Sequence, residues 1–133
     1  MGQRKQKYKP KAFESTGISA DTSANLYNSM LTHPAFIALK TRQKILYVYC
    51  KAQYYGKRKP GKDFPDVEAV QSEECFYMNL SLAVSYGLYT RNGNKEFYAD
   101  MKALCDAGFL EMVTNGRATQ SRSIYRFSDK WSL

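Results

Sequence analysis

Three cysteines and one histidine are the side chains best suited to nucleophilic or metal chemistry. Cys50, Cys75 and Cys105 are far apart in the sequence, and no pair has the close spacing of a zinc or redox motif. His33 is the only imidazole that could activate a nucleophile or join a metal site, and it stands beside a proline near an expected helix start. We therefore expect no metal site, and packed, reduced thiols in a cytoplasmic protein.

Carboxylates and glycines form no catalytic pattern either. Several acids lie between positions 63 and 74 and could bind a metal in principle, but acids clustered in a loop are usually solvated. No glycine-rich phosphate loop of the GxxxxGK[ST] type is present. Without a recognisable catalytic constellation, the sequence predicts a protein that is not an enzyme and carries no cofactor.

The charge distribution predicts a polyanionic partner. The chain has 133 residues and a net charge of +8 at pH 7. Residues 1–62 contain 13 Lys or Arg and 2 acids, a local +11, whereas residues 63–133 contain 7 and 10, a local −3. Nucleic acid is the polyanion that we expect. The alternatives are a solvated basic tail and an anionic membrane surface, although the tail lacks the apolar face of an interfacial helix.

A helix within residues 92–110 is the element best placed to contact nucleic acid. Phe97, Met101 and Leu104 recur at helical spacing and form its apolar face. We expect Asn92 or Asn94 to cap its start. Gly108 continues the apolar face and suits the left-handed conformation that ends a helix. The opposite face is cationic and able to hydrogen-bond, as a helix in the major groove should be. It comprises Lys95, Tyr98 and Lys102.

Strands and a second helix flank this helix. Residues 75–78 suit a strand, and residues 79–86 suit a helix capped by Asn79 or Ser81 and closed by Gly87. After the main helix, residues 109–114 and 123–127 are expected to pair as a hairpin, with a connection that begins at Asn115-Gly116.

Two further helices are expected upstream. Thr32 is the expected N-cap of a short helix that ends near residue 39 and has proline in its first turn. Thr41 is the expected N-cap of a helix over residues 42–55. The buried stripe of that helix is expected to be Ile45, Val48, Tyr49 and Ala52, broadened by Leu46 and Cys50. Its other tyrosines, Tyr47, Tyr54 and Tyr55, are expected in the core rather than on a base-stacking platform.

The order of helix, turn, helix and basic hairpin is that of a winged helix. Short motifs add to the likeness, namely Ala107-Gly108-Phe109-Leu110, Asn115-Gly116-Arg117 and Phe127-Ser128-Asp129-Lys130-Trp131, with Ala35-Phe36 and Leu46-Tyr47-Val48-Tyr49 upstream. Over about residues 27–131 the chain resembles winged helix-turn-helix DNA-binding proteins of bacterial plasmids, phages and integrative elements. The resemblance implies an α+β fold, helices with a small antiparallel sheet and a β-hairpin wing. It also implies a basic mobile-element protein that initiates replication, regulates transcription or helps transfer DNA.

The expected organisation is a tail and one domain. Residues 1–24 form a basic, flexible tail, and residues 25–133 form the winged-helix domain with a charged loop insertion at about 56–74. No apolar run of about 18 residues exists, so no membrane partner is expected. The expected partners are double-stranded DNA and other proteins of the same element, in an oligomeric state that the sequence does not predict.

Ten residues are the predicted DNA contacts, in three groups. The first group faces base edges and comprises Asn94, Lys95, Tyr98 and Lys102. The second contacts phosphate from the turn and the wing and comprises Arg91, Arg117 and Arg122. The third adds non-specific affinity and comprises Lys57, Arg58 and Lys59. Four acids on or beside the main helix oppose tight binding, namely Glu96, Asp100, Asp106 and Glu111.

The main alternative is a winged helix that binds other proteins within a replication or transfer complex, because the fold alone does not determine the function. The partner would then contact Tyr89, Tyr98, Tyr125 and Phe127. RNA binding is a third possibility, favoured only by the charge and the tyrosines.

The basic tail gives the first testable prediction. Deletion of residues 1–11 removes five cations, so binding should weaken by the same factor on every DNA sequence. The slope of log affinity against log salt should fall by up to about 0.9 for each phosphate that the shortened protein no longer neutralises. Titrations of a DNA duplex at several salt concentrations measure this slope, and an unchanged slope would mean that the tail contacts no phosphate.

Overall fold

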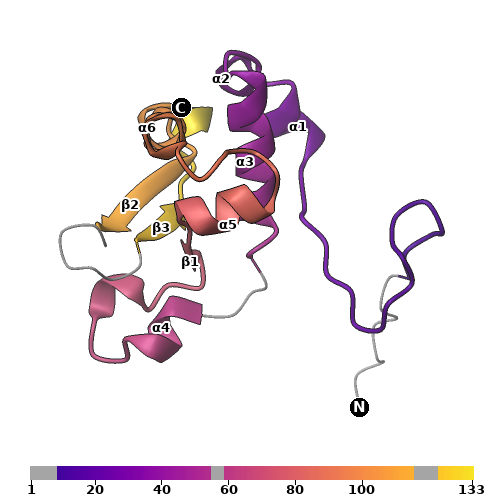
Figure 1. Ribbon diagram of the computed structural model, residues 1–133, viewed down its shortest axis with the longest axis horizontal. Coiled ribbons are helices and arrows are strands. Elements are labelled where there is room, and N and C mark those ends of the chain that lie inside the picture. Colours follow the sequence, from indigo (N-terminus) through magenta and orange to yellow (C-terminus); the bar gives the residue numbers. More distant parts are fainter. Residues whose placement is uncertain (1–8, 55–58, 116–122) are drawn as a thin grey trace.

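The computed structural model describes residues 9–54, 59–115 and 123–133. Within them, six α-helices and a three-stranded antiparallel sheet form an α+β fold (Figure 1), which confirms the predicted class. The helices are α1 (Asn28–Leu31), α2 (Pro34–Ile37), α3 (Thr41–Lys51), α4 (Lys59–Asp63), α5 (Leu80–Ser85) and α6 (Asn94–Asp106). The strands are β1 (Cys75–Tyr77), β2 (Leu110–Thr114) and β3 (Ile124–Phe127). Two short 3-10 helices are η1 (Glu68–Val70) and η2 (Lys130–Ser132).

The sheet has the order β1-β3-β2, with β3 in the centre. Tyr125 pairs with Phe76 of β1 and with Met112 of β2, so these three side chains share one face. That face joins the main core beneath α6 and α3, whereas Ile124 and Cys75 on the other face pack against Val70 of η1. The predicted strands are therefore confirmed to within one residue at each end. The connection from β2 to β3 lies outside the described residues beyond Asn115.

Helix α6 confirms the predicted amphipathic helix but not its predicted N-cap. Phe97, Met101 and Leu104 are buried as expected. Gly93 occupies the N-cap position without a side-chain bond, and Asn94 is already the first helical residue. A side chain at 93 would crowd the turn, because its Cβ would lie 3.1 Å from the Thr90 carbonyl oxygen. Close packing of the turn therefore decides this position, ahead of the capping preference of asparagine.

Helices α5 and α6 both end at a glycine in the left-handed conformation. Asn79, one of the two predicted caps, caps the start of α5, because its Oδ1 accepts a hydrogen bond from the Leu82 N–H at 2.9 Å. Gly87 has φ +77° and Gly108 has φ +88°. After α6, the Phe109 N–H donates to the Leu104 carbonyl and the Gly108 N–H to the Cys105 carbonyl, the two bonds of a Schellman motif. The predicted helix ends are confirmed.

Helix α3 buries a different stripe from the predicted one. Its buried residues are Gln43, Leu46, Tyr47 and Cys50, whereas Ile45 is 41% exposed. Both stripes have helical spacing, but the observed one places Tyr47 edge-on to Phe109, with ring centroids 5.4 Å apart. Tyr47 is thus a core residue, as expected. Tyr54, also expected in the core, is instead 39% exposed, and Tyr55 lies outside the described residues. The helix is also shorter than predicted, because it ends at Lys51.

Neither predicted threonine N-cap is observed. Lys40 precedes α3, and its N–H donates to the Gln43 side chain at 3.0 Å. His33 caps α2, and its Nδ1 accepts from the Ala35 N–H at 3.1 Å. Thr32 instead closes α1, by donating its hydroxyl to the Asn28 carbonyl at 2.8 Å. The side chain of Thr32 is therefore engaged with the helix before it rather than the helix after it.

The region predicted as a charged loop contains helical structure. Helix α4 packs against β1, with Pro60 and Gly61 buried. Asp63 accepts from the Tyr77 hydroxyl at 2.8 Å, and the Gln71 side chain donates to the Phe64 carbonyl at 2.7 Å. The expectation of a loop is therefore wrong for residues 59–63, where packing overrides poor helix propensity.

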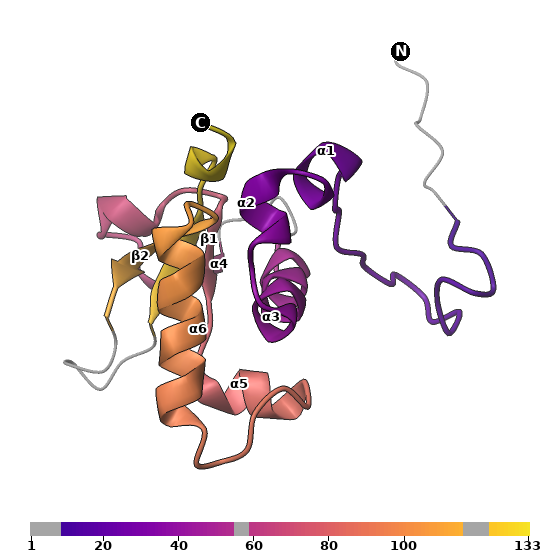
Figure 2. The ribbon, with the colours of Figure 1, turned by 90° about the horizontal axis from the view of Figure 1, so that it is seen from above.

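Residues 9–24 extend away from the helices and the sheet in both ribbon views (Figure 1, Figure 2) and are mostly exposed. Phe13 in this segment is 86% exposed. In the described part of the chain, no helix is both long and apolar enough to cross a bilayer.

The C-terminal residues close the core at the end of α6. Trp131 stacks on Phe109, with ring centroids 5.7 Å apart and an interplanar angle of 4°. It also meets His33 edge-on at 5.2 Å. The Trp131 N–H donates to the Gly108 carbonyl at 3.1 Å. These contacts join the start of α2 to the strand that follows α6.

The two helix-ending glycines allow a matched test of this packing. A Cβ at Gly108 would lie 2.6 Å from the Trp131 backbone nitrogen, whereas one at Gly87 would meet no atom within 4 Å. Gly87→Ala should cost only the left-handed strain of about 1 to 2 kcal/mol. Gly108→Ala should cost about 1 to 3 kcal/mol more, because backbone must move. Denaturant unfolding measures both, and equal losses would contradict the packing of residues 130–131 on α6.

Candidate nucleic-acid interface

The exposed face of α6 carries the four side chains predicted to face base edges. Asn94, Lys95 and Lys102 are exposed, and Tyr98 is half-buried. They lie opposite the buried Phe97, Met101 and Leu104, and the first two sit in the first turn. The structure therefore brings this predicted group together on one face of one helix.

Lys102 already has an acidic neighbour on this face. Its Nζ lies 2.8 Å from Asp106 Oδ2, one helical turn further on, and both side chains are largely exposed. The hydrogen bond from Lys102 to Asp106, together with the attraction between their charges, raises the pKa of the Lys102 ammonium. Because exposed ion pairs are weak, Lys102 remains able to exchange Asp106 for an external anion.

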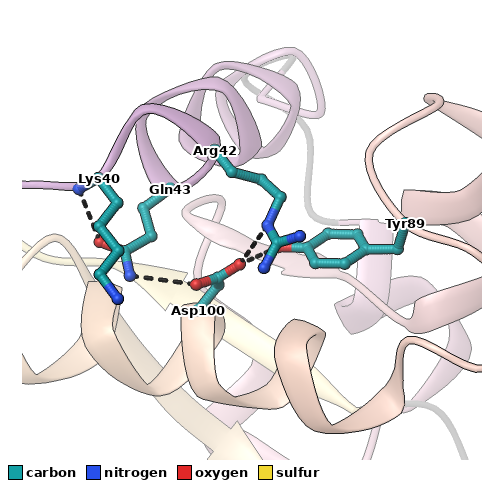
Figure 3. Close-up of polar contacts among 5 residues, drawn as sticks. All are labelled: Lys40, Arg42, Gln43, Tyr89 and Asp100. Atoms are coloured by element: carbon teal, nitrogen blue, oxygen red, sulfur yellow. Dashed lines mark hydrogen bonds and ion pairs between the residues drawn. The ribbon is translucent and has the colours of Figure 1, made fainter.

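Asp100 does not weaken the cationic face, contrary to the sequence-based expectation. It is 6% exposed and points from α6 toward α3 (Figure 3). Arg42 Nε donates to it at 2.8 Å and Gln43 Nε2 at 3.1 Å, and the Tyr89 hydroxyl also donates. The Arg42 guanidinium carbon lies 4.5 Å from the Tyr89 ring centroid. This cluster of Asp100, Arg42, Gln43 and Tyr89 is called the Asp100 network below.

The Asp100 network keeps its carboxylate charged. Burial alone would raise the pKa of Asp100, but the hydrogen bonds from Tyr89, Gln43 and Arg42 and the charge of Arg42 together lower it. The same network holds three parts of the chain in register, namely α3, α6 and the turn that contains Tyr89.

The position of Asp100 in the sequence indicates that its carboxylate has a buried partner. Asp100 lies three residues after Phe97 and directly before Met101, within the apolar stripe of α6. A carboxylate in such a stripe needs a buried partner. Its partner Arg42 is 58 residues away, however, so no local spacing identifies it.

Glu111 is also turned away from the exposed face of α6. It accepts from Arg126 at 2.6 Å across the β2–β3 ladder. This pair lies on the sheet face opposite Tyr125, which packs beneath α6. Of the four acids predicted to oppose binding, only Glu96 and Asp106 therefore lie exposed on the helix.

The predicted phosphate contacts are only partly described. Arg91 is exposed in the turn before α6. Lys59 is exposed on α4, which packs against β1 at one edge of the sheet. Helix α6 contacts β2 at the other edge, so Lys59 lies apart from the predicted base contacts on α6. The remaining predicted contacts, Lys57, Arg58, Arg117 and Arg122, lie outside the described residues.

Two of the tyrosines proposed as protein contacts are inaccessible. Tyr125 is fully buried, and Tyr89 is 8% exposed and bonded to Asp100. Tyr98 and Phe127 are half-buried. A partner that binds this conformation can therefore reach only the second pair.

The described residues bring no three His, Cys, Asp or Glu side chains together as metal ligands. Cys50 and Cys75 are buried and Cys105 is half-buried. Burial raises the pKa of each thiol above its ordinary value. Comparisons with known protein families, with characterised proteins and with solved structures find no match.

The Asp100 network predicts a specific acid sensitivity. Because the folded pKa of Asp100 is lowered, its contribution is complete above the unfolded pKa of about 3.9 and disappears as the pH falls through the folded value. Asp100→Asn should lose about 1 to 3 kcal/mol of unfolding free energy at neutral pH. Its stability should also vary less between pH 5 and pH 2 than that of the parent protein.

Asp106→Asn is the matched control, since it neutralises an exposed carboxylate on the same helix. It should leave the neutral-pH stability nearly unchanged. Urea unfolding at each pH measures these effects, and indistinguishable profiles for the two variants would contradict a structural role for Asp100.

Proposed function

We propose that the chain is a winged helix-turn-helix protein that binds double-stranded DNA and acts by binding rather than by catalysis. The element order from α3 through β1, α5, α6, β2 and β3 supports this proposal, as does the sheet order β1-β3-β2. In this reading α6 enters the major groove, and the β2–β3 hairpin is the wing. The resemblance to mobile-element proteins suggests a bacterial cytoplasmic role in replication initiation, transcription regulation or DNA transfer.

The observation that carries the proposal is the division of α6 into two faces. The buried face contains Phe97, Met101 and Leu104, and its one charged residue, Asp100, is paired with Arg42 inside the protein. The outer face keeps an amide and two ammonium groups exposed, from Asn94, Lys95 and Lys102. These groups are donors suited to the acceptors of guanine and to phosphate.

The N-terminal end of α6 adds a second favourable feature. Arg91 lies exposed in the preceding turn, and the first amides of the 13-residue helix have no partners within it. Backbone phosphate oxygens are attracted to such helix ends. The basic tail and the predicted wing arginines would supply further phosphate contacts.

A protein-interaction module is the second candidate. The exposed charges of α6 sum to zero, because Lys95 and Lys102 are balanced by Glu96 and Asp106. A groove of about 600 Å³ also opens beside α1 and α3, over Phe127 and Trp131. Both signs of charge line it, through Lys51, Arg126, Lys130, Glu74, Glu111 and Asp129. An apolar floor with a rim of mixed charge suits a polypeptide segment.

Titration of a random-sequence duplex at two salt concentrations separates the two candidates. A DNA-binding protein should bind in the low-salt buffer and lose affinity steeply as salt rises. Absence of binding in the low-salt buffer would favour the interaction module.

The first turn of α6 provides the sharper prediction. After selection of a preferred site from a random duplex pool, Lys95→Ala or Asn94→Ala should reduce discrimination by about 1 to 3 kcal/mol for each base contact that the substitution removes. Arg117→Ala, which changes the predicted wing, should weaken all sequences by the same factor.

Lys130→Ala is the charge-matched control. Lys130 packs on Gly108, at the far end of α6 from Lys95. Lys130→Ala should therefore leave the preference among DNA sites unchanged. If selection enriches no site, α6 does not read sequence, and if Arg117→Ala alone alters the preferred site, the wing is the reader.

A further inference from the structure

The segment before α1, residues 9–24, is folded on itself and away from the core. This segment is called the arm below. The Glu14 N–H donates to the Lys11 carbonyl at 2.8 Å, and the Lys11 N–H donates to Glu14 Oε1 at 2.9 Å. Further along, the Ser15 hydroxyl donates to Asp21 and closes a loop over residues 15–21. Among the described residues, Leu26 is the first hydrophobic side chain in the chain that packs against the main core.

The arm presents two large apolar side chains to solvent. Phe13, inside the first turn, is 86% exposed, and Ile18, at the tip of the closed loop, is 65% exposed. Ala20 in the same loop has φ +58°, a left-handed conformation that disfavours any residue with a side chain. Strained backbone of this kind is common at binding sites. The arm therefore has the character of a preformed binding element.

The groove beside α1 and α3 is an apolar surface that complements the arm. It has a volume of about 600 Å³, and its described lining includes one methionine and four aromatic residues, namely Met30, Tyr27, Tyr47, Phe127 and Trp131. Phe127 and Trp131 are half-buried, so neither ring is fully covered by the chain itself. Clefts of about 300 to 1,000 Å³ accommodate compact apolar groups. The groove can thus take large side chains such as those of the arm.

The charges of the two surfaces are compatible. In the groove, Arg126 pairs with Glu111 at 2.6 Å. The other charges of the described lining are two cations and two acids, namely Lys51, Lys130, Glu74 and Asp129. The arm also carries two of each, namely Lys9, Lys11, Glu14 and Asp21. Neither surface has a net charge that repels the other, and a rim of mixed charge is typical of a protein interface.

The arm points away from the groove of its own chain. Asn25 and Tyr27, which follow the arm closely in sequence, line the groove. In both ribbon views, however, the arm lies on the opposite side of α1 from the C-terminal residues of the groove (Figure 1, Figure 2). Residues 22–25, where the chain would have to reverse, contain neither glycine nor proline. The arm is therefore better placed to reach the groove of a second copy.

We propose that two copies of this chain associate by exchanging arms, so that Phe13 and Ile18 of each copy are buried in the groove of the other. The contact is isologous, because each copy gives one arm and receives one. It engages 16 arm residues and the 14 described groove residues of each copy, which meets the roughly 20 to 30 residues per side of a stable interface. The proposal does not depend on DNA binding.

Trp131 is the only tryptophan of the chain and lines the groove, so its fluorescence reports on the occupation of the groove. The parent protein should have twice the monomer mass in sedimentation equilibrium. Dilution should change the Trp131 emission over the concentration range in which the dimer dissociates. Phe13→Asp should raise the dimer dissociation constant by about 100-fold or more, because each dimer loses two buried aromatic contacts.

A matched pair of variants tests the groove. Tyr27 is the exposed N-cap residue of α1 and Val67 is the exposed N-cap residue of η1, and neither side chain makes a capping bond. Aspartate is favourable at an N-cap, so both variants should fold. Tyr27→Asp should weaken the dimer as Phe13→Asp does. Val67→Asp changes a residue outside the described lining of the groove and should leave the dimer unchanged.

A mixture of Phe13→Asp and Tyr27→Asp distinguishes arm exchange from other modes of association. Its mixed dimer retains one intact arm in one intact groove, so the mixture should dimerise at a lower concentration than either variant alone. No gain on mixing would overturn the exchange.

A monomeric parent protein would overturn the proposal as well. If Phe13→Asp then altered the Trp131 emission, the arm would occupy the groove of its own chain. If the emission stayed the same, the groove would be left to a partner other than the arm.

Discussion

A single buried carboxylate fixes the position of α6. Asp100 accepts hydrogen bonds from Arg42 and Gln43 of α3 and from Tyr89 of the preceding turn. A buried charge is tolerated only when its hydrogen bonds are complete. A rotation or shift of α6 relative to α3 would break at least one of these bonds. The exposed face of α6 therefore has one permitted orientation.

Apolar packing fixes the two ends of the same helix. At the start, Phe97 meets the Tyr89 ring edge-on at 5.5 Å, beneath the tight turn at Gly93. At the end, Gly108 lies under the backbone of Trp131, which stacks on Phe109. The polar network specifies the register, and the aromatic contacts pack the two ends of the helix. This division explains how the helix can hold its position and leave one whole face for a partner.

Local patterns predict much of this arrangement. Features that depend on neighbours within a few residues agree with prediction. They are the apolar stripe of α6, the glycines that end α5 and α6, the Asn79 cap and the strand ends. The choice of stripe in α3 depends on which residues meet distant partners, so Gln43 was not predicted to be buried. Helix α4 contains Pro60 and Gly61 and forms because it packs against β1.

The candidate site divides in the same way. Spacing alone groups Asn94, Lys95, Tyr98 and Lys102 on one face of a helix. It does not predict that Asp100 turns inward or that Glu111 pairs across the ladder on the other side of the sheet, because both outcomes depend on tertiary partners.

The strand order has a consequence for synthesis on the ribosome. β3 is the last strand in the chain, yet β1 and β2 each pair with it and not with each other. Neither strand pair of the described sheet can form until residues 124–127 have left the exit tunnel, long after β1 has been synthesised. During this interval α3, α5 and α6 have their sequences complete but no sheet to cover. Nascent chains that stall before β3 should therefore be the most exposed to proteases and chaperones.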